Sequence, residues 1–253
     1  MAGDGGAGRL FGVGVGPGDP ELLTVKAARI LGQCGVVAHF AARRRPGNAW
    51  TTVQALLRPE QIVLRLEYPL TTEPAVRDEY ERCIGEFYDG AAEDVAAHLD
   101  GGADVAVVCE GDPFFYGSYM HLHHRLCGRY DTEVVPGITS LSAACAAAGT
   151  PLVSMRETLT VLPGVLPWED LAETLAGVDA AVVMKVGRHL GAVRDALSAA
   201  GRAGEAVYVE RASCSDERVL PVAETDGVDA PYFSLVLVPG RALGRRADRR
   251  AGR

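Results

Sequence analysis

The feature that most constrains the fold of this chain is a glycine-dense segment near its start. Residues 10–19 read Leu-Phe-Gly-Val-Gly-Val-Gly-Pro-Gly-Asp, and apolar side chains recur at helical spacing over residues 20–31. This order predicts a short strand, a glycine loop and a helix, with Asp19 as N-cap, Pro20 in the first turn and Gly32 as the stop. Such a loop at a helix start typically binds a ligand that carries phosphate or carboxylate.

The usual phosphate-binding motifs do not fit this loop. The pattern G-x-G-x-x-G fails from Gly12 because Pro17 stands at the third glycine, and it fails from Gly14 because Asp19 stands there. The Walker pattern fails because no Gly-Lys-Ser/Thr follows. A nucleotide-binding dehydrogenase is therefore disfavoured, and the loop is expected to bind another kind of ligand.

Length and charge exclude several classes of protein. The chain has 253 residues, enough for one large or two small domains. Its formal net charge of −8 argues against a nucleic-acid partner, and only residues 241–253 are basic, which we expect to be a solvated, disordered end. Apolar runs fall far short of the ~18 residues of a membrane span, and residues 1–8 do not resemble a signal peptide, so no membrane association is expected.

Cysteine and histidine spacing gives no sign of a metal site. The six cysteines show no C-x-x-C pairing, so we expect reduced thiols in a cytoplasmic protein. His121, His123 and His124 fit no common zinc spacing and have no obvious cysteine or carboxylate partner. The sequence therefore predicts no bound metal.

Apolar strands alternate with helical patterns along the whole chain, which predicts an α/β protein. We expect two α/β domains, at residues 1–130 and 131–253, and a mixed sheet in the second because strand density rises there. After the first strand, the expected strands are residues 36–40, 62–66, 104–109, 132–135, 158–162, 180–186, 206–210, 218–222 and 232–238. The expected later helices are residues 76–99, 141–148, 168–175 and 189–199.

Three glycine- and proline-rich loops each follow an apolar strand, at residues 12–19, 110–117 and 136–140. Any one of them alone is most simply an ordinary turn. In an α/β sheet, however, loops at the carboxyl ends of strands gather at one edge, where ligands bind. The sequence therefore predicts that these three loops share a ligand site.

These loops also resemble a known family. Residues 12–24, Gly-Val-Gly-Val-Gly-Pro-Gly-Asp-Pro-Glu-Leu-Leu-Thr, resemble the N-terminal signature of the tetrapyrrole (corrin/porphyrin) methylases. Residues 110–117, Glu-Gly-Asp-Pro-Phe-Phe-Tyr-Gly, and 135–140, Val-Pro-Gly-Ile-Thr-Ser, are similar to the second and third motifs of that family. The resemblance runs from about residue 10 to residue 238.

Within the family, the chain is most similar to the precorrin-2 C(20)-methyltransferases. The segments that carry this similarity are residues 109–118, 136–143, 149–152, 183–186, 208–211 and 232–235. The uroporphyrinogen-III methylases usually carry a tyrosine-aspartate pair after the second strand, where this chain has His39 and Phe40. Without that acid, activity in the siroheme branch is disfavoured.

The resemblance implies two α/β domains with S-adenosylmethionine in the cleft between them. It implies cofactor contacts at Pro17, Glu110, Gly111, Asp112, Phe115, Thr139, Ser140, Met184, Ala212 and Ser234. The residue types suit this role, because glycine loops expose backbone groups, Thr139 and Ser140 offer hydroxyls, and Met184 offers a soft apolar wall. Simple core packing explains Met184 equally well.

The implied reaction transfers a methyl group from S-adenosylmethionine to C(20) of precorrin-2, giving precorrin-3A and S-adenosylhomocysteine in cobalamin biosynthesis. The ring is itself the nucleophile, so no serine, cysteine or metal is required. The base that removes the proton from the methylated carbon is not identifiable from the sequence. Glu110 and Asp112 lie near the right place, but a structural or cofactor role suits each better.

The ring substrate carries several carboxylates, so an acidic protein must concentrate cations near it. Arg43, Arg44 and Arg45 directly follow the second strand and are our candidates for that patch, with a solvated loop as an equal alternative. His39 is placed with the substrate residues because the carbon-20 subfamily usually has an aromatic-proline pair there.

Two other functions stay open at this point. The first is the same methylation on cobalt-factor II in the metal-early route, because both subfamilies share the motifs. The second is a non-catalytic protein that binds tetrapyrrole or cofactor, which the intact cofactor loops disfavour. Family resemblance also implies a homodimer.

Overall fold

The computed structural model describes residues 6–43, 45–69 and 77–242. The chain divides into two compact units, Met1–Thr139 and Ser140–Arg253. They meet later in the chain than the expected residue 130, because strand β5 (Thr132–Val135) pairs with β1 (Leu10–Gly14) and so belongs to the first sheet.

The first unit contains a five-stranded, fully parallel sheet in the order β3-β2-β4-β1-β5. The remaining strands are β2 (Val36–Ala41), β3 (Ile62–Glu67) and β4 (Val105–Cys109). Every residue of β1 and β4 is buried, as expected for central strands covered by helices on both faces. The predicted α/β class is confirmed.

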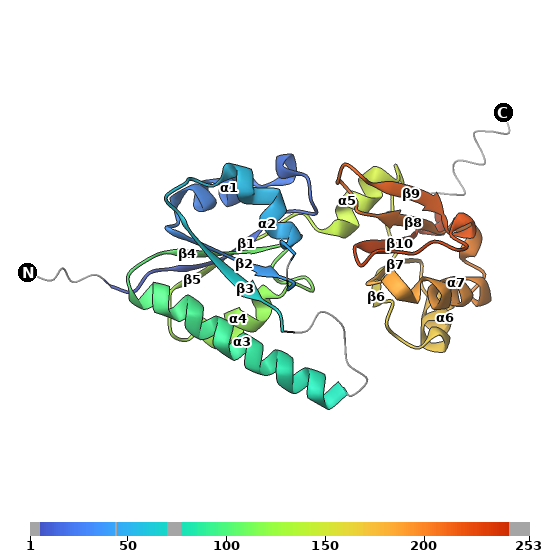
Figure 1. The fold of residues 1–253 in the computed structure, drawn as a ribbon. Coiled ribbons are helices and arrows are strands. Elements are labelled where there is room, and N and C mark those ends of the chain that lie inside the picture. The colour runs from blue at the N-terminus through green and yellow to red at the C-terminus, as the bar shows by residue number, and fades with distance from the viewer. Residues whose placement is uncertain (1–5, 44, 70–76, 243–253) are drawn as a thin grey trace, which may run out of the picture. The chain divides into compact units, whose positions relative to one another are not determined.

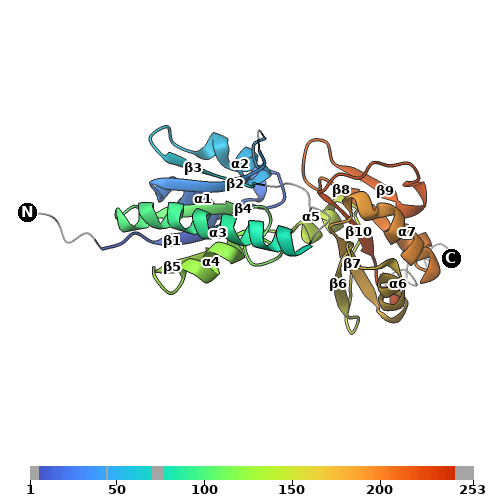
Figure 2. The same cartoon turned by 60° about the horizontal axis from the view of Figure 1, so that its bottom comes forward.

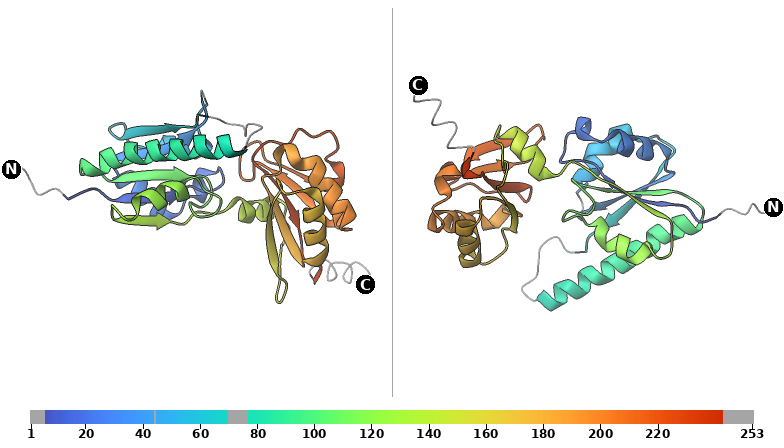
Figure 3. Two further views of the ribbon diagram at one scale, coloured as in Figure 1. Left: turned by 90° about the horizontal axis from the view of Figure 1, so that it is seen from below. Right: turned by 180° about the vertical axis from the view of Figure 1, so that it is seen from behind.

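Helices cover both faces of this first sheet. Figures 1 and 3 show α1 (Val25–Gln33) and α2 (Asn48–Val53) on one face, and α3 (Arg77–Asp100) and α4 (Tyr119–Leu126) on the other. Side chains alternate along each strand, so each face has its own buried apolar cluster.

The first helix differs from its predicted form. Residues Pro20–Leu22 make a separate 3-10 turn, and α1 begins only after Thr24, whose hydroxyl accepts from the Ala27 N–H at 3.1 Å. Asp19 caps the short turn instead, accepting from the Glu21 N–H at 2.8 Å. Two capping side chains five residues apart thus divide the segment.

The apolar pattern of this segment was also partly misleading. Ala27, Ile30 and Leu31 are buried as predicted, but Val25 is 88% exposed. The helix continues through Gly32 to Gln33. Helix α2 was not predicted at all, because six residues are too few to show a periodic pattern.

The second unit contains a mixed sheet in the order β6-β7-β10-β8-β9, as predicted. Only β6 and β7 pair in parallel, and the other pairs are antiparallel. The strands are β6 (Leu159–Pro163), β7 (Ala180–Met184), β8 (Val207–Glu210), β9 (Arg218–Pro221) and β10 (Ser234–Val238).

Figure 2 shows α5 (Ser140–Ala147) on one side of this second sheet and α6 (Trp168–Gly177) and α7 (Leu190–Ala199) on the other. Each side again has its own buried cluster. Further 3-10 turns occupy Gln54–Leu56, Gly187–His189, Ala203–Glu205 and Val222–Glu224. Within the described residues, no helix is both long and apolar enough to cross a membrane.

Candidate ligand site

The three predicted loops come together at the carboxyl edge of the first sheet. Gly16 and Gly111 form an antiparallel bridge, in which the Gly111 N–H donates to the Gly16 carbonyl at 2.8 Å. A Cβ built on Gly137 would lie 1.9 Å from the Gly111 carbonyl oxygen, and one built on Gly14 would lie 2.6 Å from the Gly137 nitrogen. The prediction that the loops gather at one edge is therefore confirmed.

Asp112 connects two of these loops through its carboxylate. One oxygen accepts from the Gly137 N–H at 3.0 Å, and the other accepts from the Phe114 N–H at 2.9 Å. Asp112 thereby fixes the loop after β5 to the loop after β4. This bonding gives the Asp112 carboxylate a structural role between the two loops.

The rest of the β4 loop bends sharply at Tyr116, whose φ of 57° lies in the left-handed region that non-glycine residues rarely adopt. Phe115 is half-buried beside the Tyr116 ring, with the two ring centroids 5.2 Å apart. Such backbone strain is common at functional sites. Pro17, in the first loop, is also half-buried next to the Gly16–Gly111 bridge.

Glu110 directly follows β4, and the backbone N–H groups of Asn48 and Ala49 at the start of α2 influence its carboxyl group. Burial raises the pKa of Glu110 to about 7, although the two N–H donors oppose that shift. The Glu110 carboxyl therefore titrates near neutrality.

His39 is buried within β2 and stacks on Trp50 of α2, with ring centroids 4.9 Å apart. Burial lowers its pKa below the ordinary value, its contact with the Phe40 carbonyl opposes this, and the Arg65 charge adds to it. The imidazole is thus neutral at pH 7. A ring this deeply buried supports α2 directly.

The arginines that follow β2 are only partly described. Arg43 and Arg45 are exposed, and Arg44 lies outside the described residues. Arg65 of β3 donates to the backbone carbonyls of Ala42 at 2.9 Å and Arg45 at 3.2 Å, which fixes the path of this loop. Arg65 therefore holds in place the backbone from which the exposed Arg43 and Arg45 side chains extend.

In the second unit, three predicted cofactor residues lie at one edge of the sheet. Met184 ends β7, Ala212 follows β8, and Ser234 begins β10, which runs antiparallel to both. The backbone turns abruptly at this edge, since Lys185 and Arg211 have φ values of 56° and 48°. The tertiary fold thus brings together residues that lie far apart in the sequence.

The Ser234 hydroxyl is already engaged within its own unit. It donates to the Pro231 carbonyl at 2.7 Å and accepts from the Gly187 N–H at 3.2 Å. It therefore orders the two loops that flank it. Met184 is half-buried and packs against the apolar cluster that contains Ala212 and Leu235. Core packing is therefore also one of its roles.

Thr139 and Ser140 stand where the two units join along the chain. Ser140 is the first residue of α5, and both residues are partly exposed. Both residues come shortly after the Pro136-Gly137 pair, with Ile138 between. The sequence prediction missed Asn48, Ala49 and Trp50, and the only signal for them was the Gly47-Asn48 turn before a short apolar segment.

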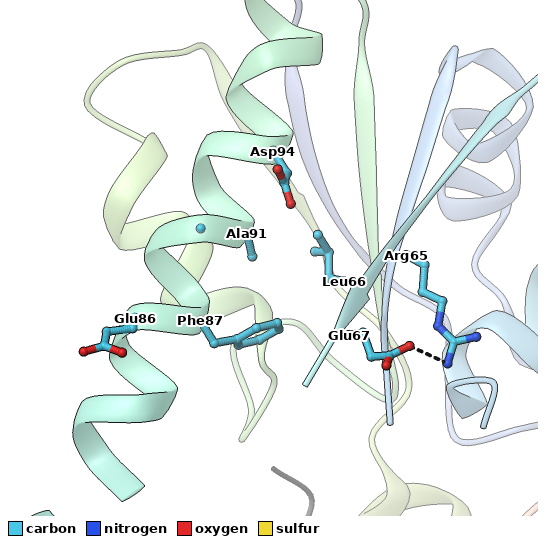
Figure 4. Close-up of a pocket in the computed structure, with 8 residues that line it drawn as sticks. Arg65, Leu66, Glu67, Glu86, Phe87, Ala91 and Asp94 are labelled. Carbon is cyan, nitrogen blue, oxygen red and sulfur yellow. Dashed lines mark ion pairs between the residues drawn. The ribbon is translucent and has the colours of Figure 1, made fainter. Parts of the chain in front are cut away.

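A pocket elsewhere in the first unit contains none of the predicted site residues. It lies between the edge strand β3 and α3, where Figure 4 shows the Phe87 ring directed from α3 toward β3. Arg65 and Glu67 on its rim form an ion pair at 3.1 Å. Its lining residues are Arg65, Leu66, Glu67, Glu86, Phe87, Gly90, Ala91 and Asp94.

The histidines of α4 take part in packing. His121 stacks on Tyr88 with ring centroids 4.2 Å apart, and His123 Nδ1 lies 3.4 Å from the Tyr119 hydroxyl. Burial lowers the pKa of both His121 and His123. Among the residues that the structure describes, no three His, Cys, Asp or Glu side chains are grouped so that they could hold a metal ion.

Comparison with known proteins decides the family. Residues 9–226 match the family model of the Tetrapyrrole (Corrin/Porphyrin) Methylases. The chain belongs to this family. The glycine loops after β1, β4 and β5 are the segments that resemble its motifs.

Individual relatives agree with this assignment. The chain is 53% identical over 236 residues to a precorrin-2 C(20)-methyltransferase of Sinorhizobium sp, covering 93% of this chain and 96% of that protein. It is 52% identical to the cobalamin biosynthesis protein CobIJ of Mycobacterium bovis, covering 94% of this chain but 47% of that protein. It is 28% identical to a cobalt-precorrin-2 C(20)-methyltransferase of Salmonella typhimurium, covering 91% of this chain and 96% of that protein.

Solved structures share the fold. A cobalt precorrin-4 methyltransferase matches with a TM-score of 0.70 and 26% identity, covering 93% of this chain and 95% of that chain. A uroporphyrin-III C-methyltransferase of Thermus thermophilus, solved in complex with S-adenosylhomocysteine, matches with a TM-score of 0.64 and 28% identity. That match covers 92% of each chain.

Proposed function

We propose that this methyltransferase transfers a methyl group from S-adenosylmethionine to C(20) of precorrin-2, giving precorrin-3A in cobalamin biosynthesis. The observation that carries the proposal is the 53% identity to a precorrin-2 C(20)-methyltransferase along almost the whole of both chains. Identity to the relative that acts on the cobalt-bound ring is 28%. The metal-free ring is therefore the favoured substrate, and cobalt-factor II is the second candidate.

The first-unit loops fit the amino-acid end of the methyl donor. Gly14, Gly111 and Gly137 pack so closely that a Cβ on Gly14 or Gly137 would collide with neighbouring backbone, so the loops present main-chain groups. Main-chain N–H and C=O groups suit an ammonium and a carboxylate. We propose that Pro17, Gly111, Asp112, Phe115, Thr139 and Ser140 hold the donor, directly or by shaping these loops.

In the second unit, Met184, Ala212 and Ser234 are the proposed cofactor residues. Met184 offers a polarizable apolar surface, and Ser234 fixes the loops on either side of it through its two hydrogen bonds. The donor supplies a methyl group activated on a sulfonium. The protein's own contribution is orientation of the reactants and exclusion of water, since the ring supplies the nucleophilic carbon.

The proposed substrate carries carboxylates, and Arg43 and Arg45 are exposed cations beside the first-unit site. We propose that the arginines of residues 43–45 pair with these carboxylates, which suits the forked guanidinium geometry. Replacement of all three by alanine should raise the KM for the tetrapyrrole about tenfold or more while the Kd for S-adenosylhomocysteine stays unchanged. An unchanged KM would show that the arginines take no part in substrate binding.

Side-by-side assays test the reaction itself. Radiolabelled methyl transfer is measured with purified protein and metal-free precorrin-2, and in parallel with cobalt-factor II. We expect transfer to the metal-free ring to be the faster. Faster transfer to the cobalt-bound ring would support the metal-early route. Binding of both ligands without transfer to either ring would support a non-catalytic binder.

We also propose that the protein works in the cytoplasm as a homodimer. All six cysteines are free thiols, which suits a reducing compartment. Light scattering coupled to size-exclusion chromatography gives the mass in solution. A mass of one 26.7 kDa chain at micromolar concentration would contradict the dimer.

A further inference from the structure

The loop after β4, residues 110–117, is held at its start by the other two glycine-rich loops. Gly111 bridges to Gly16, and the Asp112 carboxylate accepts from the Gly137 N–H at 3.0 Å. Both contacts lie in the first half of the loop. The second half, which carries the proposed donor residue Phe115, must therefore be positioned from its other end.

The second half of this loop follows a tight and strained path. Tyr116 has a φ of 57°, in the left-handed region that is unfavourable for a residue with a bulky side chain. A Cβ built on Gly117 would lie 2.6 Å from the Pro113 carbonyl oxygen, so the chain folds back closely on itself. Such a conformation persists only where the surrounding contacts hold it on both sides. We therefore looked for a second point of attachment beyond Gly117.

Ser118 provides this attachment. It stands at the N-cap position of α4, where a serine hydroxyl commonly accepts from N–H groups of its own helix. Among the described residues of α4, none donates such a capping hydrogen bond to Ser118. The Ser118 hydroxyl instead lies 2.5 Å from the hydroxyl of Tyr68, which directly follows β3. This hydrogen bond joins the end of the β4 loop to the end of β3.

Tyr68 is itself held by both its backbone and its ring. Its N–H donates to the Ala41 carbonyl at 2.9 Å, which extends the pairing of β3 with β2. Its ring centroid lies 5.6 Å from that of Phe40 and 4.8 Å from that of Phe87, which Figure 4 shows directed from α3 toward β3. Its hydroxyl also lies 3.4 Å from the Tyr88 hydroxyl. The Tyr68 hydroxyl therefore offers Ser118 a partner with a fixed position.

We propose that Tyr68 is a positioning residue, which holds the second half of the β4 loop in the geometry that binds S-adenosylmethionine. It acts through its hydrogen bond to Ser118. Tyr68 lies outside all three glycine-rich loops, and it comes into reach of the site only because β3 ends beside the β4 loop. The role rests on the proposed function for the identity of the ligand, whereas the ordering of the loop does not.

Three variants and a matched control test the hydrogen bond. Tyr68→Phe and Ser118→Ala each remove one hydroxyl and keep the surrounding packing, and the double variant removes both. Tyr130→Phe is the matched control, because it also deletes a hydrogen-bonded tyrosine hydroxyl, which donates to Asp100 at 2.8 Å. Tyr130 precedes β5 and therefore lies at the amino edge of the same parallel sheet, opposite the site.

Each protein is examined in three ways. Hydrogen exchange follows the amides of Phe115 and Met120, which donate to carbonyls of the β4 loop at 3.2 Å and 3.3 Å. Calorimetric titration gives the Kd for S-adenosylhomocysteine, and methyl-transfer kinetics give kcat and the KM for S-adenosylmethionine. Glu60→Ala, which breaks an exposed ion pair with Arg58, is a second control.

In Tyr68→Phe and Ser118→Ala, we expect the amides of Phe115 and Met120 to exchange about fivefold faster, because the loop loses one of its two attachments. The Kd for S-adenosylhomocysteine and the KM for S-adenosylmethionine should each rise about fivefold, with kcat changed by less than about twofold. The double variant should resemble either single variant, since all three lack the same hydrogen bond. Both controls should match the wild type in these measurements.

Three results would overturn the proposal. The first is unchanged exchange at Phe115 and Met120 in Tyr68→Phe. The second is a Kd for S-adenosylhomocysteine within about twofold of the wild type despite faster exchange, which would limit Tyr68 to a structural role. The third is additive losses in the double variant, which would show that the two hydroxyls act separately. If the wild-type protein binds no S-adenosylhomocysteine, the proposed function fails, whereas the exchange experiment still decides whether Tyr68 orders the loop.

Discussion

At the scale of single residues, the first-unit site depends on glycines, which have no side chain. The nearest atoms to a Cβ on Gly137 would be the Gly111 carbonyl oxygen at 1.9 Å and the Gly14 Cα at 2.9 Å. Both are backbone atoms, which cannot move aside as a flexible side chain would. The glycines therefore set how closely the loops after β1, β4 and β5 approach one another.

Gly137→Ala should consequently disturb both the fold and ligand binding. We expect the unfolding free energy to fall by about 1–3 kcal/mol, because backbone must shift to relieve the overlap, and the affinity for S-adenosylhomocysteine to fall as the loops separate. Denaturant titration and calorimetry measure the two effects. Gly90→Ala is the control: a Cβ there meets nothing within 4 Å, and in a helix it should stabilise by up to about 1 kcal/mol.

The Glu110 carboxyl makes stability depend on pH. Its pKa of about 7 in the folded protein lies above the ordinary value of 4.5, so the folded state binds the proton more tightly than the unfolded state. The unfolding free energy contributed by this group therefore falls as pH rises from about 4.5 to about 7, and the loss persists at higher pH.

Glu110→Gln removes this titration. At pH 8 we expect the variant to be more stable than the wild type by about 1–3 kcal/mol, and at pH 4 the two should agree. Urea unfolding at a series of pH values measures the difference. A difference independent of pH would show that the Glu110 pKa is the same in the folded and unfolded states.

At the scale of elements, one buried cation connects several segments of the second unit. Arg202, 1% exposed, follows α7 and donates to the carbonyls of Leu175, Val178, Asp179 and Pro239. Its remaining nitrogen contacts Glu205. A single guanidinium thereby joins the end of α6, the start of β7 and the end of β10, since its planar fork can serve several acceptors at once.

Arg202→Met should therefore destabilise the protein by about 3–5 kcal/mol, because it leaves buried carbonyls without donors. Thermal or urea unfolding measures the loss. Arg194→Met is the matched control on the same unit, where an exposed ion pair with Asp226 is removed and the expected loss is at most about 1 kcal/mol. Equal losses in the two variants would contradict this view of Arg202.

How well each helix or strand was predicted from the sequence depended on its length and burial. Central strands such as β4 were located within a residue because each is a continuous apolar run. Helix α2 escaped prediction, and the Pro20–Leu22 turn was merged into α1, because their boundaries depend on capping and tertiary hydrogen bonds rather than on periodicity. The same contacts place Asn48, Ala49 and Trp50 at the site.

At the scale of the whole molecule, the proposed cofactor residues come from both units. Saturation with S-adenosylhomocysteine at about 100 times its Kd should stabilise the protein by about 2.7 kcal/mol. Gly137→Ala in the first unit and Ser234→Ala in the second should each reduce this ligand-induced gain, measured against the unliganded form of the same variant. Glu60→Ala should keep the full gain. If either variant keeps the full gain, the unit that contains the substituted residue takes no part in cofactor binding.

The sequence by itself determined the α/β class, most strands, the mixed second sheet and the family, because apolar periodicity and glycine-rich motifs are local properties of a chain. Only the tertiary structure decided that Gly14, Gly111 and Gly137 are in mutual contact, that the Asp112 carboxylate binds backbone, and that His39 stacks on Trp50 of α2. These facts depend on strand order and on packing between segments far apart in the sequence. Which buried backbone N–H and C=O groups need a side-chain partner depends on this packing, so no local sequence pattern predicts it.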